Sequence, residues 1–310
     1  MSKGLFLKRF SIRTILDEAG VIWYLLSKLC EVINVVAVVD MGSNSFILLL
    51  QHEGETLLEE VYEVGLKSIE DEDEAFEVAS QVISQIKTKV QNVPIHVFGT
   101  AIFRERPHLF ERIVRQFRLK GEILSEEDEA YFTYMSVDPS FEKSITVFDL
   151  GGGSLEVVRK DWFMSLPLGT HVLNRLFDLS LPEIRQFEEA VKHVESMLPS
   201  FTNPVGVGGS FVAIASMKRG KWDLKAVEGF VLNWSDVEAV IERLRGNSFE
   251  QVRGWNVIPA GREKTIVAGC AVALAITKHE PVKVSTKGFR HTVARMLEEG
   301  GIQRPWARSG

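Results

Sequence analysis

The chain has 310 residues, of which 45% are hydrophobic and 25% are charged. This composition is that of a globular protein large enough for two domains with separate hydrophobic cores. The formal net charge of −6 gives a global field that repels polyanions, which argues against a general nucleic-acid-binding protein. A polyanionic substrate would therefore need local attraction at its site. The two cysteines, Cys30 and Cys270, have no metal-binding spacing and predict reduced thiols in a cytoplasmic protein.

Residues 1–34 begin with a basic stretch and continue into apolar residues that charged side chains interrupt. The longest uncharged run, residues 19–27, is too short to span a membrane, and no small-residue cleavage motif follows it. We therefore predict an N-terminal helical extension, without integral membrane association, that packs on the body of the protein or is disordered. Binding to a partner or to a membrane surface is the alternative.

The apolar periodicity predicts alternating strands and helices in two successive series. The first series is a hairpin over 35–51, a strand over 57–64, a helix over 75–90, a strand over 95–98, a helix after 107, a strand over 122–124 and a helix over 125–134. The second series is a hairpin over 145–158, a strand over 162–166, helices after 170 and over 182–198, a strand from 204, helices over 211–217, 236–244 and 265–277, a strand over 282–284 and a final helix to 297. This order predicts an α/β protein with two related domains. We place the first domain at 35–127, completed by 298–310, and the second at 128–297.

A phosphate-loop pattern occurs twice in the chain. Each copy has an apolar run, an Asp, a Gly/Ser-rich turn and a second apolar run, so that residues 40–45 (DMGSNS) align with 149–154 (DLGGGS). Such a hairpin turn can aim several backbone N–H groups at one anion, and the Asp can hold a metal ion or orient water. Two copies about 110 residues apart predict two similar domains that face each other across a phosphate-sized cleft. Two unrelated hairpins with ordinary turns are the alternative.

Seven short motifs follow one another in a recognisable order. They are DMGSNSF (40–46), GTAIFRE (99–105), EILSEEDEA (122–130), FDLGGGSLE (148–156), LPLGT (166–170), GVGGS (206–210) and STKGFR (285–290). Together they resemble the exopolyphosphatase / guanosine pentaphosphate phosphohydrolase family of the actin-like ATPase superfamily, over about residues 36–297. The resemblance implies two related actin-like (ribonuclease H-like) domains facing a central cleft. Because the additional C-terminal domain of long members is lacking, the chain is similar to the short, two-domain form.

The resemblance also implies a role for each matching residue. Glu129 aligns with a glutamate that activates water, while Asp149 and Glu156 align with acids that organise the attacked phosphate and Mg²⁺ or another divalent cation. Asp40 aligns with the acid of the first loop and is a third candidate metal ligand, and Arg104 matches an arginine that faces the substrate phosphate. The residues expected to bind phosphate oxygens are Gly42, Ser43, Asn44, Ser45, Thr100, Gly151, Gly152, Gly153, Ser154, Gly208, Gly209 and Ser210.

The chemistry of these residue types agrees with that assignment. Hydrolysis of a phosphoanhydride needs in-line positioning of water and cancellation of charge on the transferring group, which backbone N–H groups, Arg104 and Mg²⁺ could provide. Glu129 could act as the base, although four consecutive acids at 126–129 also suit the start of a helix. A surface position is the alternative for Arg104. Lys287 and Arg290, which open a helix, either contact distal phosphates or form a solvated helix end.

The chain departs from the family pattern by losing positive charge. Ile47, Tyr131 and Val212 stand where basic residues are common, and an Arg-containing loop expected after Val64 is replaced by the acidic KSIEDEDE run (67–74). These departures leave open the preference between substrates and its dependence on chain length.

The first hypothesis is a Mg²⁺-dependent hydrolase that releases terminal orthophosphate from polyphosphate, or converts guanosine pentaphosphate to tetraphosphate. The alternatives are a polyphosphate- or alarmone-binding regulator with weak turnover and an actin-like kinase that uses ATP. The expected partners are polyphosphate or the guanosine penta- and tetraphosphates, no nucleic acid, and a second copy of the chain in a homodimer.

Overall fold

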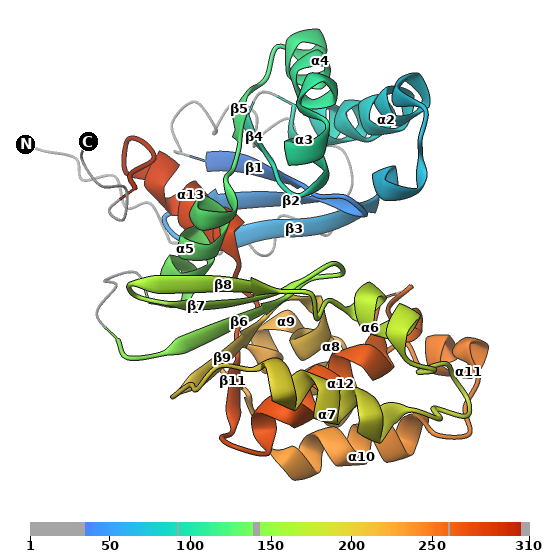
Figure 1. Ribbon diagram of the computed structural model, residues 1–310. Helices are drawn as coiled ribbons and strands as arrows, with labels where there is room; N and C mark the ends of the chain where they lie inside the picture. The colour runs from blue at the N-terminus through green and yellow to red at the C-terminus, as the bar shows by residue number, and fades with distance from the viewer. Residues whose placement is uncertain (1–34, 92, 139–142, 260, 305–310) are drawn as a thin grey trace, which may run out of the picture. The chain divides into compact units, whose positions relative to one another are not determined.

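The structure is a computed structural model that describes residues 35–91, 93–138, 143–259 and 261–304 (Figure 1). The helical extension predicted for 1–34 lies outside the described residues. The described chain divides into two compact units. The first unit comprises the residues up to Ile123 together with Ala294–Gly301, and the second comprises Leu124–Val293 and the residues from Ile302 onward. The chain thus leaves the first unit four residues before the predicted boundary at 127, and it re-enters that unit at 294.

The first unit contains a five-stranded sheet with the order β3-β2-β1-β4-β5. Its strands are β1 Val35–Met41, β2 Ser45–His52, β3 Glu55–Glu63, β4 Ile95–Gly99 and β5 Lys120–Ile123. The first three form an antiparallel meander, whereas β4 is parallel to β1 and β5 is parallel to β4. The carboxyl ends of β1, β4 and β5 therefore lie at one edge of the sheet.

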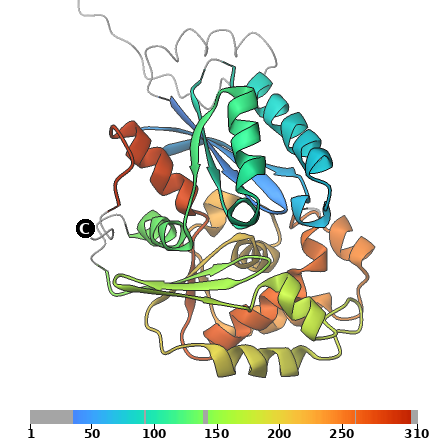
Figure 2. The same ribbon diagram turned by 45° about the horizontal axis from the view of Figure 1, so that its top comes forward.

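Four helical segments accompany this sheet, namely η2 Leu66–Ser68, α2 Glu72–Val90, α3 Ile102–Glu105 and α4 Pro107–Phe117. Helix α2 begins after Asp71, whose carboxylate accepts a hydrogen bond from the Glu74 N–H at 2.7 Å, a standard N-cap. Its apolar face is buried at helical spacing, for example at Ala79, Ile83 and Ile86, in the core that also includes β1 and α4. Helices α2 and α4 lie side by side in both views (Figure 1 and Figure 2).

The second unit repeats the sheet topology of the first. Its strands are β6 Thr146–Leu150, β7 Leu155–Arg159, β8 Trp162–Leu166, β9 Pro204–Val207, β10 Val231–Leu232 and β11 Val282–Val284. The order is β10-β11-β9-β6-β7-β8, with an antiparallel β6–β7–β8 meander, β9 parallel to β6 and β11 parallel to β9. Strands β6, β7, β8, β9 and β11 thus correspond to β1 to β5, and β10 is added at the edge.

The helices of the second unit enclose one strongly apolar helix. In chain order they are α5 Glu126–Val137, α6 Thr170–Leu176, α7 Phe187–Met197, α8 Gly209–Arg219, α9 Leu224–Val227, α10 Trp234–Leu244, α11 Phe249–Gly254, η3 Arg262–Lys264 and α12 Ile266–Thr277. Every residue of α12 is buried, because α6, α7, α8 and α10 pack around it. Helix α13 Phe289–Glu298 begins in the second unit and ends in the first. No helix of the described ranges is long and apolar enough to span a membrane.

One predicted helix is shorter than its sequence pattern indicates. The pattern extends over 182–198, whereas α7 begins at Phe187. Ile184 has φ of +50°, which a right-handed helix does not contain, and its side chain is buried in the core of the unit. The apolar residues before Phe187 therefore reach the core from a turn, which helical periodicity cannot distinguish from another helical turn.

Candidate functional site

The two predicted phosphate loops form the same backbone turn. In the first unit the Gly42 N–H donates to the Ser45 carbonyl at 3.1 Å, and in the second the Gly151 N–H donates to the Ser154 carbonyl at 3.0 Å. Each turn joins the first two strands of its sheet. The alignment of the two loops in the sequence thus corresponds to equivalent positions in three dimensions.

In the first unit, Thr100 lies beside the turn. The Thr100 N–H donates to the Met41 carbonyl at 3.1 Å, and a Cβ on Gly42 would lie 4.0 Å from Thr100 Oγ1. Asp40 precedes this turn at the end of β1. Arg104 lies on α3 and is half-buried. The first unit thus gathers Asp40, Thr100 and Gly42 at the carboxyl ends of β1 and β4, with Arg104 on the short helix that follows.

In the second unit, two carboxylates lie on adjacent strands. Asp149 of β6 is the direct cross-strand partner of Glu156 of β7. Ser165 Oγ donates to Glu156 Oε1 at 3.2 Å, and Thr133 Oγ1 lies 3.4 Å from Asp149 Oδ2 as a weak donor. Glu129 is located one helical turn before Thr133 on α5, and residues four apart share a helix face. The three predicted acids are therefore brought to one place.

The proximity of the acids affects the protonation of Glu156. Burial, together with the charges of Asp149 and Glu129, raises the pKa of Glu156 to about 7, although hydrogen bonds from Ser154 and Ser165 offset part of the effect. Like charges that face each other across a strand pair are unfavourable. A cation bound between them would remove this repulsion.

The chemistry of the pair fits a magnesium ion that is completed by substrate. Within the described ranges, no group of three or more His, Cys, Asp or Glu side chains is arranged to hold a metal ion. Mg²⁺ in phosphate-processing sites is commonly held by one or two carboxylates together with waters and substrate phosphates. Asp149 and Glu156 provide such a pair. Asp40, the third candidate ligand, lies in the other unit.

The second loop is held in place by a glycine that sequence reasoning did not assign to the site. A Cβ on Gly169 would lie 2.3 Å from the Gly153 carbonyl carbon and 2.3 Å from the Ser154 nitrogen, so no larger residue fits. The Thr170 and His171 N–H groups at the start of α6 donate to the Gly151 and Gly152 carbonyls at 3.1 and 2.9 Å. Because a trans peptide directs its N–H opposite to its C=O, the Gly152 and Gly153 N–H groups, which share peptides with these two carbonyls, point away from α6. The only sequence signal was the LPLGT motif itself.

The third loop lies against Asp149. Gly208 has φ of +96°, and a Cβ there would lie 2.8 Å from the Leu150 carbonyl oxygen and 3.2 Å from Asp149 Oδ1. Helix α8 begins at the next residue, and the free N–H groups of a helix N-terminus suit an anion. The Ser210 side chain is buried and packs against Gly269 of α12. A phosphate contact by Ser210 would therefore use its backbone N–H.

A basic residue that sequence reasoning missed also lies at the third loop. A Cβ on Gly209 would lie 2.2 Å from Arg262 Nη2 and 2.5 Å from Arg262 Cζ, so the guanidinium covers this glycine. The family position occupied by Val212 is buried and apolar here. Arg262 thus supplies positive charge at a loop where the expected basic residue is lost. No motif surrounds Arg262 in the sequence, so only the tertiary structure reveals it.

Lys287 and Arg290 belong to a loop at the same sheet edge. The Ser285 N–H donates to the Gly206 carbonyl at 2.9 Å, which places this loop beside the end of β9. Glu228 Oε2 accepts from the N–H and the hydroxyl of Thr286, both at 2.7 Å. Lys287 is exposed and Arg290 is half-buried. The carboxyl ends of β6, β9 and β11 therefore carry Asp149 and two further loops, at the edge where ligands bind in open α/β sheets.

The repeated meander-and-crossover topology, with a glycine turn after the first strand of each sheet, defines an actin-like two-domain protein, as predicted. The chain matches the Ppx/GppA phosphatase family over residues 37–298 and belongs to that family. This membership confirms the resemblance noted in the sequence and supports a phosphohydrolase activity.

Solved structures agree with this assignment of the fold. A Ppx/GppA family member from Aquifex aeolicus is 23% identical, covers 86% of this chain and 99% of its own, and has a TM-score of 0.69. An exopolyphosphatase from Cytophaga hutchinsonii is 21% identical with the same coverage and a TM-score of 0.72. No curated protein matches the chain by sequence.

Proposed function

We propose that the protein hydrolyses terminal phosphoanhydride bonds, releasing orthophosphate from inorganic polyphosphate or converting guanosine pentaphosphate to tetraphosphate. The observation that carries the proposal is the convergence of Asp149, Glu156 and Glu129 beside the Gly151–Ser154 turn. The Cytophaga hutchinsonii relative of the same fold is described as an exopolyphosphatase. Membership of the phosphatase family supports hydrolysis of a phosphate bond as the reaction. The likeness to the exopolyphosphatase supports polyphosphate as the substrate.

Each group of the second unit has a defined part in this proposal. Mg²⁺, held by Asp149 and Glu156, would neutralise charge on the transferring phosphoryl group. The backbone N–H groups of residues 152–154 and 208–210 would bind its oxygens, and fixed donors of this kind stabilise developing charge. Glu129 would accept a proton from the attacking water. Arg262 would add a cation at the third loop.

The first unit is proposed to bind phosphate with the same backbone geometry. Its turn, formed by Gly42, Ser43, Asn44 and Ser45, matches that of residues 151–154 in hydrogen bonding, and Thr100 and Arg104 follow on β4 and α3. Its cross-strand pair is Asp40 with Ile47, so a second carboxylate is lacking at this position. We therefore assign the metal principally to the second unit and phosphate binding to both turns.

The test is phosphate release by the purified full-length chain with Mg²⁺ from long-chain polyphosphate, guanosine pentaphosphate and ATP. Glu129→Gln is the diagnostic variant, and Glu127→Gln, an exposed acid on the same helix turn, is the matched control. Release from one of the first two substrates that is lost in Glu129→Gln and retained in Glu127→Gln supports the proposal. Binding of polyphosphate without turnover would instead indicate a regulator, and acceptor-dependent ADP formation would indicate a kinase.

A further inference from the structure

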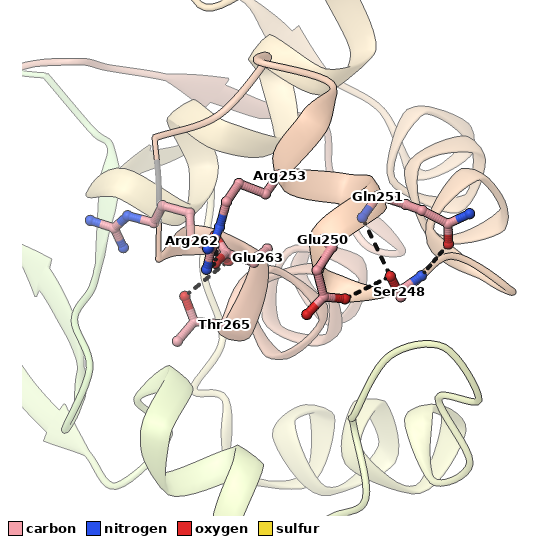
Figure 3. A network of polar contacts seen from close by, with 7 residues as sticks. All are labelled: Ser248, Glu250, Gln251, Arg253, Arg262, Glu263 and Thr265. Carbon is pink, nitrogen blue, oxygen red and sulfur yellow. Dashed lines mark hydrogen bonds and ion pairs between the residues drawn. The ribbon is translucent and has the colours of Figure 1, made fainter.

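The 3₁₀ turn η3 (Arg262–Lys264) places Arg262 at the third loop. Its central residue, Glu263, forms an ion pair with Arg253. The side chain of Glu263 is fully buried, whereas that of Arg253 on α11 is 55% exposed. Arg253 Nε donates to Glu263 Oε1 at 3.0 Å, and Arg253 Nη2 donates to the same oxygen. The Arg253–Glu263 pair therefore ties this turn to α11 (Figure 3).

The buried carboxylate is ionised and depends on Arg253. Burial by itself would raise the pKa of Glu263, but the hydrogen bond and charge of Arg253, together with backbone N–H groups, hold that pKa below its ordinary value. The second oxygen, Oε2, has no hydrogen-bond partner among the described residues. Burying a carboxylate is costly even when it is paired with a cation, so the presence of Glu263 at this position points to a role other than stabilisation of the fold.

Other contacts hold the same turn from its remaining sides. Asn174 Nδ2 of α6 donates to the Lys264 carbonyl at 2.8 Å. The Arg262 carbonyl accepts from the Thr265 N–H at 3.0 Å and, weakly, from its hydroxyl at 3.4 Å. Helix α11 itself starts with a Ser248–Gln251 capping box. The backbone at Arg262 is thus fixed, and Figure 3 shows its guanidinium pointing away from the Arg253–Glu263 pair.

We propose that the Arg253–Glu263 pair is a positioning device that holds Arg262 over Gly209, where Arg262 binds a phosphoryl oxygen of the substrate at the third loop. The inference deepens the proposed function and rests on it. A guanidinium is effective at such a site when its fork is held in one orientation. Glu263 and Arg253 do not themselves contact the phosphate and act through Arg262.

The test measures the binding of Mg²⁺–tripolyphosphate to the full-length chain by calorimetric titration, in a Glu129→Gln background that prevents turnover. Arg262→Gln is expected to weaken binding by about tenfold or more, the usual effect of losing one charged hydrogen bond. Arg253→Gln is expected to weaken it by several-fold and to add no further loss when combined with Arg262→Gln. A pair with only a structural role would give additive effects, because it would not act through Arg262.

Two further variants keep the test decisive. Arg253→Lys retains a cation opposite the buried carboxylate, so it is expected to fold and to show an intermediate loss of affinity. Glu195→Gln breaks the Lys278–Glu195 pair in the same unit and is expected to leave affinity unchanged. If the wild-type chain binds and hydrolyses polyphosphate while both Arg253 variants bind tripolyphosphate normally, the inference is wrong and the proposed function stands. If the wild-type chain neither binds nor hydrolyses these substrates, both fail.

Discussion

Asp149 lies directly opposite Glu156 across the β6–β7 strand pair. In the first unit the equivalent position opposite Asp40 is occupied by Ile47. The duplicated turn is therefore chemically asymmetric, with two facing acids in one copy and a single acid in the other. Because facing carboxylates repel each other unless a cation or proton intervenes, this pair is where the proposed metal ion would have its largest effect.

Mg²⁺ is expected to stabilise the protein through this pair. A ligand at about 100 times its Kd adds about 2.7 kcal/mol to the free energy of unfolding, which is a shift of several degrees in Tm for a domain of this size. Thermal unfolding with and without Mg²⁺ measures the effect. In Asp149→Asn the shift should be largely lost, whereas Asp161→Asn, a change at an exposed turn acid, should retain it. An equal shift in both variants would contradict the assignment.

Glu129→Gln is expected to lower kcat by about 10²–10⁴, the usual contribution of a general acid or base. KM should change little, because the amide has the shape of the carboxylate and the phosphate-binding loops are untouched. Steady-state kinetics on polyphosphate with saturating Mg²⁺ provide the measurement. A kcat within a factor of two of the wild-type value would exclude Glu129 as the base.

Gly169→Ala is expected to displace the second loop. The added Cβ would meet backbone atoms of Gly153 and Ser154 at 2.3 Å, and overpacking of this kind costs about 1–3 kcal/mol. Both the free energy of unfolding in urea and the rate of phosphate release should therefore fall. Gly254→Ala is the control, because a Cβ at Gly254 has no atom within 4 Å and stability should be unchanged. Normal stability and activity in Gly169→Ala would contradict the prediction, because the loop would then accommodate the added Cβ without cost.

His291 is expected to make stability depend on pH below neutrality. Burial, with the nearby charges of Arg290 and Lys287, holds the pKa of this histidine well below its ordinary value, and its Nδ1 accepts a hydrogen bond from the Gly288 N–H at 3.1 Å. The unfolded chain then binds a proton near pH 6.5 that the native state does not bind. The contribution of neutral His291 to the free energy of unfolding is therefore fully present above that pH. It is lost as the pH falls, by at most about 1.4 kcal/mol per pH unit.

Urea unfolding of the wild type and of His291→Asn at pH 7, 6 and 5 tests this expectation. Asparagine retains an acceptor for the Gly288 N–H and does not titrate, so the variant should lose less stability between pH 7 and pH 5. His108→Asn replaces an exposed histidine and should follow the wild type. The same pH dependence in all three proteins would show that other groups account for acid destabilisation.

Local patterns in the sequence were sufficient for the architecture. Alternating apolar runs split by glycine turns predicted both hairpins, and the alignment of residues 40–45 with 149–154 predicted the repeated topology. These features are local, since a hairpin brings neighbours in sequence into contact. The same reasoning predicted that Asp149 and Glu156 lie close together, because only six residues separate them and both belong to one hairpin. It was wrong at 182–198, where Ile184 adopts a turn conformation that apolar periodicity does not record.

The sequence by itself thus determined the fold class, the family and the part of the candidate site that the two hairpins carry. Only the tertiary structure decided which distant residues join it. Gly169 approaches the second loop, Thr133 reaches Asp149, and Arg262 covers Gly209. Parallel strands are connected by long crossovers, so residues that meet at the carboxyl ends of β6, β9 and β11 are far apart in sequence. Their proximity follows from the packing of α5, α6 and η3 against the sheet and helices, which has no signature in any single segment.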